Sequence, residues 1–234
     1  MRSKSVSLFS GGIDSFLCWY LFCQDALNIF VNIGQKYIKK ERMVLQNLTK
    51  NIPEFNVMEH KGSLIGSFED KKSGIIPNRN AELILNAAQY GENIYLGVIK
   101  DEINSDKSPE FIKSMQDVLN ISNRKQYWTD GKTFKILMPT KKYNKTDLIK
   151  MYLDKGGLVE NLQLTVSCYS DTEHHCGNCA SCFKRWIAFK NNDIPLKTMS
   201  NPMDFAQKQG VFKKCEDGTY SDDRANEILS AIQR

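Results

Sequence analysis

The sequence contains no apolar stretch approaching the roughly 20 residues that a membrane-spanning helix needs. No secretion signal is visible before its first apolar run, and there are no internal repeats or low-complexity tracts. We therefore expect a cytoplasmic globular protein with no membrane partner. Its 234 residues suffice for one large domain or for a domain with an appendage.

A dense basic module is also missing. The formal net charge is +5, and the lysines and arginines are spread along the chain. This balance permits contact with nucleic acid but is weak evidence for it. We therefore expect a small-molecule partner rather than nucleic acid.

Seven cysteines without a secretion signal favour reduced thiols and metal ligation over disulfides. Cys168, Cys176, Cys179 and Cys182 are separated by seven, two and two residues. Four thiolates at such spacing can close a tetrahedral site, so they predict structural zinc. A redox CxxC motif and two unrelated pairs of buried thiols are the alternatives. The remaining thiols are expected to serve packing: Cys18, Cys23 and Cys215.

A glycine loop near the N-terminus is the second candidate site. A short apolar run ends at Ser10-Gly11-Gly12, and a helical pattern follows without a spacer. Strand, glycine turn and helix present backbone N–H groups and the positive end of a helix to an anion such as phosphate. Asp14 and Ser15 fall at the first helical positions, where they favour helix initiation and could face a metal or phosphate. The loop matches neither Walker A nor GxGxxG, so an ordinary glycine turn remains the alternative.

Apolar runs alternate with helical patterns up to Leu158. This alternation predicts an α/β fold, a Rossmann-like, doubly wound parallel sheet of five strands covered by helices on both faces. Ligands bind such sheets beyond the carboxyl ends of the strands. The expected strands are 5–9, 28–33, 55–59, 94–98 and 134–138, and the loops that follow them are 10–15, 34–37, 62–80, 100–108 and 139–145.

After Leu158 the alternation stops and the cysteine cluster follows. We expect three parts: a Rossmann-like domain over 1–160, a zinc-binding segment over 161–190 and a helical tail over 191–234. The tail is predicted to form short helices over 195–209 and 222–233, which could pack on a partner subunit.

The loop Ser10-Gly11-Gly12-Ile13-Asp14-Ser15 resembles the SGGxDS loop of the ATP-pyrophosphatase superfamily, whose fold is of the adenine nucleotide alpha hydrolase type. The resemblance implies cleavage of ATP between its α and β phosphates, with Mg²⁺ and with the loop holding the departing pyrophosphate. In that superfamily a substrate oxygen takes up AMP, and a nitrogen or sulfur nucleophile then displaces it.

Together, the loop and the cysteine cluster resemble the 7-cyano-7-deazaguanine synthase family of queuosine biosynthesis. That family converts 7-carboxy-7-deazaguanine to the nitrile with ATP and ammonia, and the resemblance implies a carbon–nitrogen ligase acting as a homodimer. Further matches follow in order over about four fifths of the chain. They are Gly34-Gln35; Pro77, Arg79 and Asn80; Gly97; Asp106, Pro109, Glu110 and Phe111; Pro139 and Lys145; Thr165, Ser167, Cys168 and Tyr169; and Gly177 and Arg185 beside the cysteines.

The resemblance implies a role for each of these positions. Adenylation of a carboxylate gathers negative charge, which needs cationic clamps, and Arg79 and Lys145 are the candidates, with Arg185 a further one. Asp14 would meet magnesium or orient the phosphates. The implied ATP-binding residues are Ser10, Gly11, Gly12, Asp14, Ser15, Gly34, Gln35 and Gly97, and the implied substrate residues are Arg79, Asn80, Asp106 and Phe111. Asp106 could equally cap the helix that follows it.

Some positions depart from the family pattern. Ile13 replaces a common Gln, Ser108 stands in place of an Arg, and Tyr37 replaces the His that follows GQ. That His is a candidate base, whereas a tyrosine, with a reference pKa near 10, is a poor base at neutral pH. We therefore expect a robust first activation, and a slow or absent step from amide to nitrile.

Other functions remain open. One is a deazaguanine-handling relative from an anti-phage operon, in antiviral defence, which stops at the amide or joins the deazaguanine to a protein amine. Another is a tRNA-modifying sulfurtransferase, although a closed cluster of four cysteines leaves no obvious sulfur carrier. A binding protein that has lost catalysis is the third.

Overall fold

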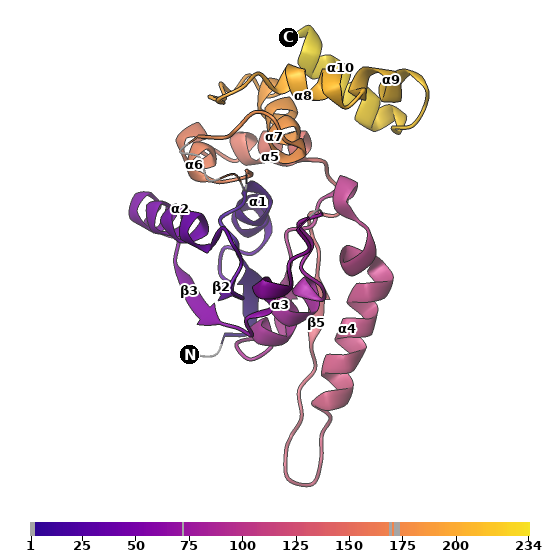
Figure 1. Cartoon of the computed structure of the whole chain (residues 1–234). Coiled ribbons are helices and arrows are strands. Elements are labelled where there is room, and N and C mark those ends of the chain that lie inside the picture. The colour runs from indigo at the N-terminus through magenta and orange to yellow at the C-terminus, as the bar shows by residue number, and fades with distance from the viewer. Residues whose placement is uncertain (1–2, 72, 169, 171–173) are drawn as a thin grey trace. The chain divides into compact units, whose positions relative to one another are not determined.

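The structure, a computed structural model of the whole chain, describes residues 3–71, 73–168, 170 and 174–234 (Figure 1). The chain divides into two compact units, Met1–Tyr143 and Asn144–Arg234. The division into three parts that the sequence suggested stays a prediction, since these two units do not test it. Among the described residues, no helix combines the length and the apolar character that crossing a membrane requires.

The first unit is built on a parallel sheet of five strands in the order β3-β2-β1-β4-β5. In β1, Val6 pairs with Leu27 on one side and with Ile94 on the other. The strands are β1 (Ser5–Leu8), β2 (Leu27–Asn32), β3 (Val57–Lys61), β4 (Asn93–Tyr95) and β5 (Lys135–Leu137). Each overlaps the range expected from its apolar run, so the doubly wound α/β fold is confirmed.

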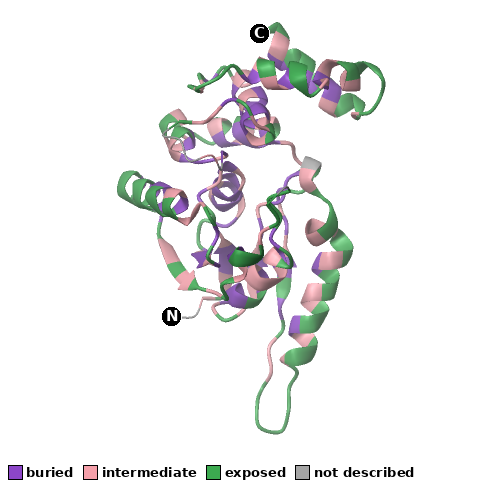
Figure 2. Ribbon diagram, viewed as in Figure 1, coloured by how far each residue is buried: buried purple, intermediate pink, exposed green. Residues whose placement is uncertain are grey.

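Helices cover both faces of this sheet. Right-handed crossovers place α1 (Ile13–Phe22) and α2 (Ile38–Asn51) on one face, and α3 (Arg79–Ala87) and α4 (Pro109–Ser122) on the other. Because both faces are covered, β2 is buried along four consecutive residues. Figure 2 shows the buried residues gathered along the strands and α1, with exposed residues along the outer sides of α2 and α4.

The two faces have different cores. Under α3 and α4, branched aliphatic side chains from the strands pack with Ile84 and Ile112. On the other face the core contains a cluster of aromatic rings. The centroid of the Phe55 ring lies 4.6 Å from that of Phe9 and 5.0 Å from that of Trp19.

The order of the strands reverses between β1 and β4, which are neighbours in the sheet although the chain visits β2 and β3 between them. Such a switch point opens a crevice at the carboxyl ends of the two strands. Short 3-10 helices lie in the connections that follow β3 and β4: Ile65–Phe68, Lys100–Glu102 and Ser105–Lys107.

The second unit is helical. Its elements are α5 (Lys145–Asp154), α6 (Val159–Leu164), α7 (Ala180–Lys190), α8 (Pro202–Lys208), α9 (Val211–Glu216) and α10 (Asp222–Gln233). Helices α5, α8 and α10 pack against α7, around a core that includes Phe183, Ile187 and Ile228.

Two expectations for the tail need correction. The helix predicted over 195–209 begins only at Pro202, because Asn201 caps it and accepts a hydrogen bond from the backbone N–H of Met203. The short helix α9 was not predicted in the tail, and neither was α6, which lies before the tail. The helix over 222–233 is confirmed, and the side chain of Ser221 caps it.

Candidate functional site

The glycine loop joins the end of β1 to the first turn of α1. Gly11 has a φ of +78°, and a Cβ there would lie 3.0 Å from Val44 of α2, so the position requires glycine. Gly12 is the N-cap of α1, and the hydroxyl of Ser15 donates to its carbonyl oxygen at 2.8 Å. The hydroxyl of Ser10 accepts from the N–H of Gly12 at 3.4 Å. These bonds hold the loop against the positive end of the helix.

Gly97, which follows β4, lies directly against this loop. A Cβ at Gly97 would lie 2.8 Å from the carbonyl oxygen of Asp14 and 3.0 Å from the Cα of Ser15. The side chain of Asp14 is half-buried in the first turn of α1. The structure therefore brings Gly97 and the loop 10–15 together at the switch point between β1 and β4.

The segment after β2 turns its glutamine inward. Gly34 has a φ of +77°, and Gln35 is only 6% exposed. The Gln35 side chain accepts from the N–H of Ile33 through Oε1 at 3.0 Å and donates to Glu41 Oε2 through Nε2 at 2.6 Å. Both ends of the Gln35 amide are thus engaged by the protein itself.

Around Glu41 lies a polar cluster that the sequence reasoning missed. Glu41 sits on α2 and is 6% exposed, and burial raises its pKa to about 7 against the opposing effects of Gln35 and Arg79. Arg79 also hydrogen-bonds the side chain of Tyr37. Burial and the charge of Glu41 raise the pKa of Tyr37, so its hydroxyl stays protonated at neutral pH and has no free site to accept a proton as a base. Glu41 was not singled out in the sequence, because it stands among basic residues in α2 and no local signal marks it as buried.

Two of the implied substrate residues meet beside this cluster. Asn80, on the first turn of α3, is buried, and its amide donates to the carbonyl oxygen of Asp106 at 3.3 Å. Asp106 does not cap α4; that role belongs to Ser108, whose hydroxyl accepts from the N–H of Phe111 at 3.1 Å. The half-buried ring of Phe111 packs against the apolar core.

Lys145 lies in the second unit, at the start of α5. Its side chain is 7% exposed, and the preceding Asn144 caps the helix by accepting from the N–H of Asp147 at 2.8 Å. Its proposed role at the phosphates remains a prediction.

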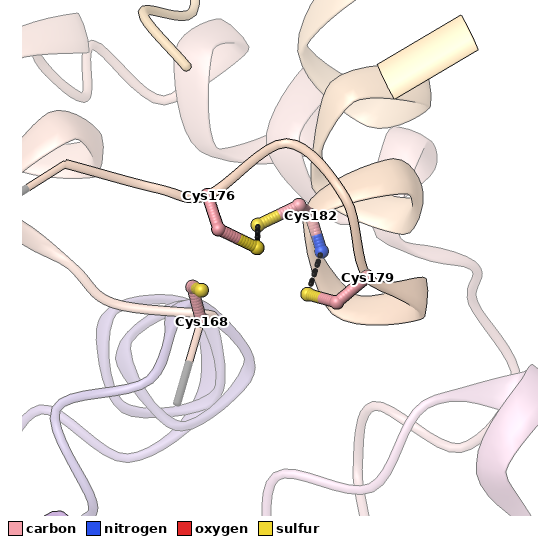
Figure 3. Close-up of side chains that lie close together, drawn as sticks. All are labelled: Cys168, Cys176, Cys179 and Cys182. Carbon is pink, nitrogen blue, oxygen red and sulfur yellow. Dashed lines mark hydrogen bonds between the residues drawn. The ribbon is translucent and has the colours of Figure 1, made fainter. Parts of the chain in front are cut away.

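The four cysteines of the predicted metal site converge (Figure 3). Their sulfur atoms all lie within 4.8 Å of one another, and those of Cys176 and Cys182 are 3.7 Å apart. Four sulfurs about 2.3 Å from one zinc ion would stand about 3.8 Å apart, so the donor set suits tetrahedral zinc. Hydrogen bonds from Cys182 lower the pKa of Cys179 to about 5, which favours a thiolate at the N-terminus of α7.

Neighbouring residues hold the cysteines in place. Gly177 has a φ of +74°, and a Cβ there would overlap the carbonyl oxygen of Ser200, so only glycine fits the turn. The Nε2 atom of His175 accepts from the N–H of Ser167 at 3.3 Å, so this histidine is part of the support, while His174 is exposed. Tyr169 lies outside the described residues.

Arg185, a further candidate clamp, is instead fully buried in the second unit. Its guanidinium donates to Thr165 Oγ1 at 2.9 Å and to the carbonyl oxygen of Leu162 at 2.7 Å, and it lies over the ring of Phe189. The side chain therefore fixes the segment that leads into Cys168 onto α7, and its suggested role as a phosphate clamp was wrong.

Comparison with known proteins supplies the family. The sequence profile described as "Queuosine biosynthesis protein QueC" matches residues 63–193, more than half of the chain. The chain belongs to this family. The region that matches QueC includes α3 with Arg79 and Asn80, and all four cysteines, whereas the loop 10–15 precedes it.

Individual relatives extend the match over most of the chain. The 7-cyano-7-deazaguanine synthase of a Marinomonas species is 27% identical over 216 residues, 81% of this chain and 94% of the relative. Synthase 1 of Colwellia psychrerythraea is 30% identical, over 82% of this chain and 96% of the relative. The synthase of Methanospirillum hungatei is also 30% identical, over 82% and 96%. The chain is thus similar to synthase enzymes of queuosine biosynthesis.

Proposed function

We propose that this QueC-family protein is an ATP-dependent carbon–nitrogen ligase that adenylates the carboxylate of 7-carboxy-7-deazaguanine, releases pyrophosphate, and lets a nitrogen nucleophile displace AMP. The observation that carries the proposal is the contact between Gly97 and Asp14. This contact supports the proposal because the glycine loop then lies at the switch point of a parallel sheet, where such folds bind ligands, in a chain similar to deazaguanine synthases.

The loop residues fit a polyphosphate. Glycines at positions 11, 12 and 97 let the backbone approach phosphate oxygens, and the hydroxyls of Ser10 and Ser15 hold the loop at the start of α1. Asp14 is the residue that would hold Mg²⁺, which supplies positive charge to the phosphates when bound. Gln35 supports the loop after β2 from within, and Gly34 provides its turn.

The clamp for the carboxylate and the transferred phosphate is Arg79, with Lys145 as its expected second member. Arg79 begins α3, where its side chain hydrogen-bonds Tyr37 and feels the charge of Glu41. The deazaguanine ring would meet Asn80 and Asp106, with the edge of Phe111 beside them. Zinc would be held by Cys168, Cys176, Cys179 and Cys182, where it would stabilise the second unit and take no part in the reaction.

Formation of the amide releases a proton from the attacking nitrogen. Tyr37 is unsuited to accept it, because its pKa is raised. Glu41 is suited, because a carboxylate with a pKa of about 7 is a competent proton acceptor near neutral pH. We assign this role to Glu41 and retain Tyr37 as the partner that orients Arg79.

The absence of the family's histidine at position 37 favours one further candidate, a relative that stops at the amide or joins the deazaguanine to a protein amine in antiviral defence. In either case we expect a cytoplasmic homodimer that uses ammonia or a protein amine. Sulfur transfer to tRNA is the weaker candidate, because a closed cluster of four cysteines leaves no obvious sulfur carrier.

Mass spectrometry of the products tests this choice. The protein is incubated with ATP, 7-carboxy-7-deazaguanine and ammonia, and pyrophosphate is measured in parallel. We expect pyrophosphate release that depends on the deazaguanine acid, with the amide accumulating before any nitrile. Nitrile as the dominant product would restore the plain synthase, and no release of pyrophosphate would refute the ligase.

A further inference from the structure

A hairpin between α4 and β5 carries an aromatic pair that the proposed reaction does not use. Residues 123–132 extend beyond the end of α4 and away from the sheet (Figure 1). The hairpin leads into the amino end of β5. It therefore lies at the end of the parallel sheet where the strands begin, whereas the loop 10–15 lies at the end where they finish. We call residues 123–132 the finger.

The backbone of the finger is ordered by its own hydrogen bonds. The N–H of Lys132 donates to the carbonyl oxygen of Asn123 at 2.8 Å, and Gln126 and Thr129 exchange both of their backbone bonds at 3.0 and 3.2 Å. Gly131 has a φ of +76°, and a Cβ there would lie 2.4 Å from the backbone nitrogen of Lys125, so the two sides of the finger are in contact.

The two residues at its tip are unusual for a tight turn. Turns are normally made by Gly, Asn, Asp, Ser or Pro, for reasons of backbone conformation and local hydrogen bonding. Here the tip is Tyr127 and Trp128, which are 96% and 67% exposed, with ring centroids 4.3 Å apart in an edge-to-face arrangement. Turn formation does not explain these residues, whereas exposed Tyr and Trp are common at contact sites.

The charged residues of the finger indicate which kind of partner it would bind. Arg124, Lys125 and Lys132 flank the tip, against one carboxylate, Asp130. Figure 2 shows the finger exposed over most of its length, including its tip. Aromatic rings among exposed cations provide stacking surfaces for unpaired bases and countercharges for phosphates. We propose that the finger is a docking site for a single-stranded polynucleotide, whose bases stack on Tyr127 and Trp128.

A second copy of the chain is the competing occupant. Val118 and Ile121 on α4 are 49% and 58% exposed and would suit a protein surface. A symmetric contact through the tips, however, would bring two basic fingers together, and their repulsion disfavours it.

Fluorescence anisotropy with a labelled 12-residue oligouridylate, its deoxy counterpart and a duplex of the same length tests the proposal. We expect both single strands to bind more tightly than the duplex. The double variant Y127S/W128S should bind the single strand at least tenfold more weakly, because removing each ring removes the stacking interaction with one base. The variant R124Q/K125Q should reduce the slope of log affinity against log salt by about 1.4, or about 0.7 for each cation removed.

Matched controls make each result decisive. The variant K208Q/K213Q removes two exposed cations from α8 and α9 and should bind as the wild type does. All variants should keep the wild-type thermal midpoint and pyrophosphate release, because the finger lies outside the core and the candidate site. Undiminished binding by Y127S/W128S, preference for the duplex, or no binding at 50 mM salt would each overturn the proposal. A change in light-scattering mass without a change in binding would assign the tip to a second copy instead.

Discussion

Gln35 Nε2 and Glu41 Oε2 are 2.6 Å apart in the interior of the first unit. The bond joins the loop after β2 to the first turn of α2. The amide of Gln35 therefore holds a carboxylate that is buried beside the candidate site. Because burial raises the pKa of Glu41 to about 7, its charge state changes within the physiological range of pH.

Replacing this carboxylate should change how stability depends on pH. A group whose folded pKa exceeds its unfolded value of 4.5 favours the folded state at low pH, and this contribution disappears as the pH rises through about 7. Glu41→Gln should therefore gain about 2 kcal/mol in free energy of unfolding relative to wild type between pH 5.5 and pH 8. Urea unfolding at both values measures the difference. Glu160→Gln, an exposed residue of α6, controls for the loss of one negative charge.

The same variant should separate the two halves of the proposed reaction. If Glu41 accepts the proton of the nitrogen nucleophile, E41Q should keep pyrophosphate release but form amide about 100-fold more slowly, within the usual range for general bases. In the wild type the rate of amide formation should rise as the pH passes about 7, and E41Q should lack this rise. Equal losses in both steps would instead mean that Glu41 only holds Gln35 and Arg79 in place.

Under the proposed function, Asp14→Ala should abolish pyrophosphate release, with a loss of at least about 100-fold, because Asp14 would hold the Mg²⁺ that offsets the charge of the phosphates. Asp25→Ala, an exposed residue after α1, should retain it. Normal release by D14A would leave the loop 10–15 as a structural turn.

Gly97→Ala should weaken ATP binding without touching any charged group. The added methyl would lie 2.8 Å from the carbonyl oxygen of Asp14, so the loop must shift to admit it. We expect a cost of about 1–3 kcal/mol in stability and a raised KM for ATP. An unchanged KM would show that the approach of the two loops is not needed for binding.

Metal analysis should find one zinc ion in each chain purified without chelator. Cys176→Ser should lose the metal and much of its solubility, since metal binding supplies folding free energy to such a segment. Cys215→Ser should keep both, as its thiol lies away from the cluster in sequence and outside the metal-binding group of the described residues. Zinc retained at full occupancy by C176S would contradict the four-cysteine site.

The sequence predicts the sheet well because its signal is local. Each strand overlaps a short run of the sequence that is rich in apolar residues, and positions such as Gly11 and Gly97 stand where only glycine fits. The cysteine cluster is equally readable, since the spacing of its ligands restricts their geometry. Residues whose role depends on tertiary burial were misjudged: Glu41 was overlooked, and Arg185 was assigned to phosphates although it is enclosed by its own unit. The start of α8 was missed because a helical pattern over 195–209 does not reveal that Asn201 caps the helix.

The close fit of Gly177 against Ser200 has a consequence for the handling of the protein. The N–H groups of Met199 and Ser200 donate to the carbonyl oxygens of His175 and Cys176, so the strand-like segment before α8 is fastened directly to the metal-binding turn. A chelator that opens the turn would therefore also release this segment to proteases. Cleavage near Ser200 after treatment with chelator would then report how much of a preparation has lost its metal, before any change in enzymatic rate is measured.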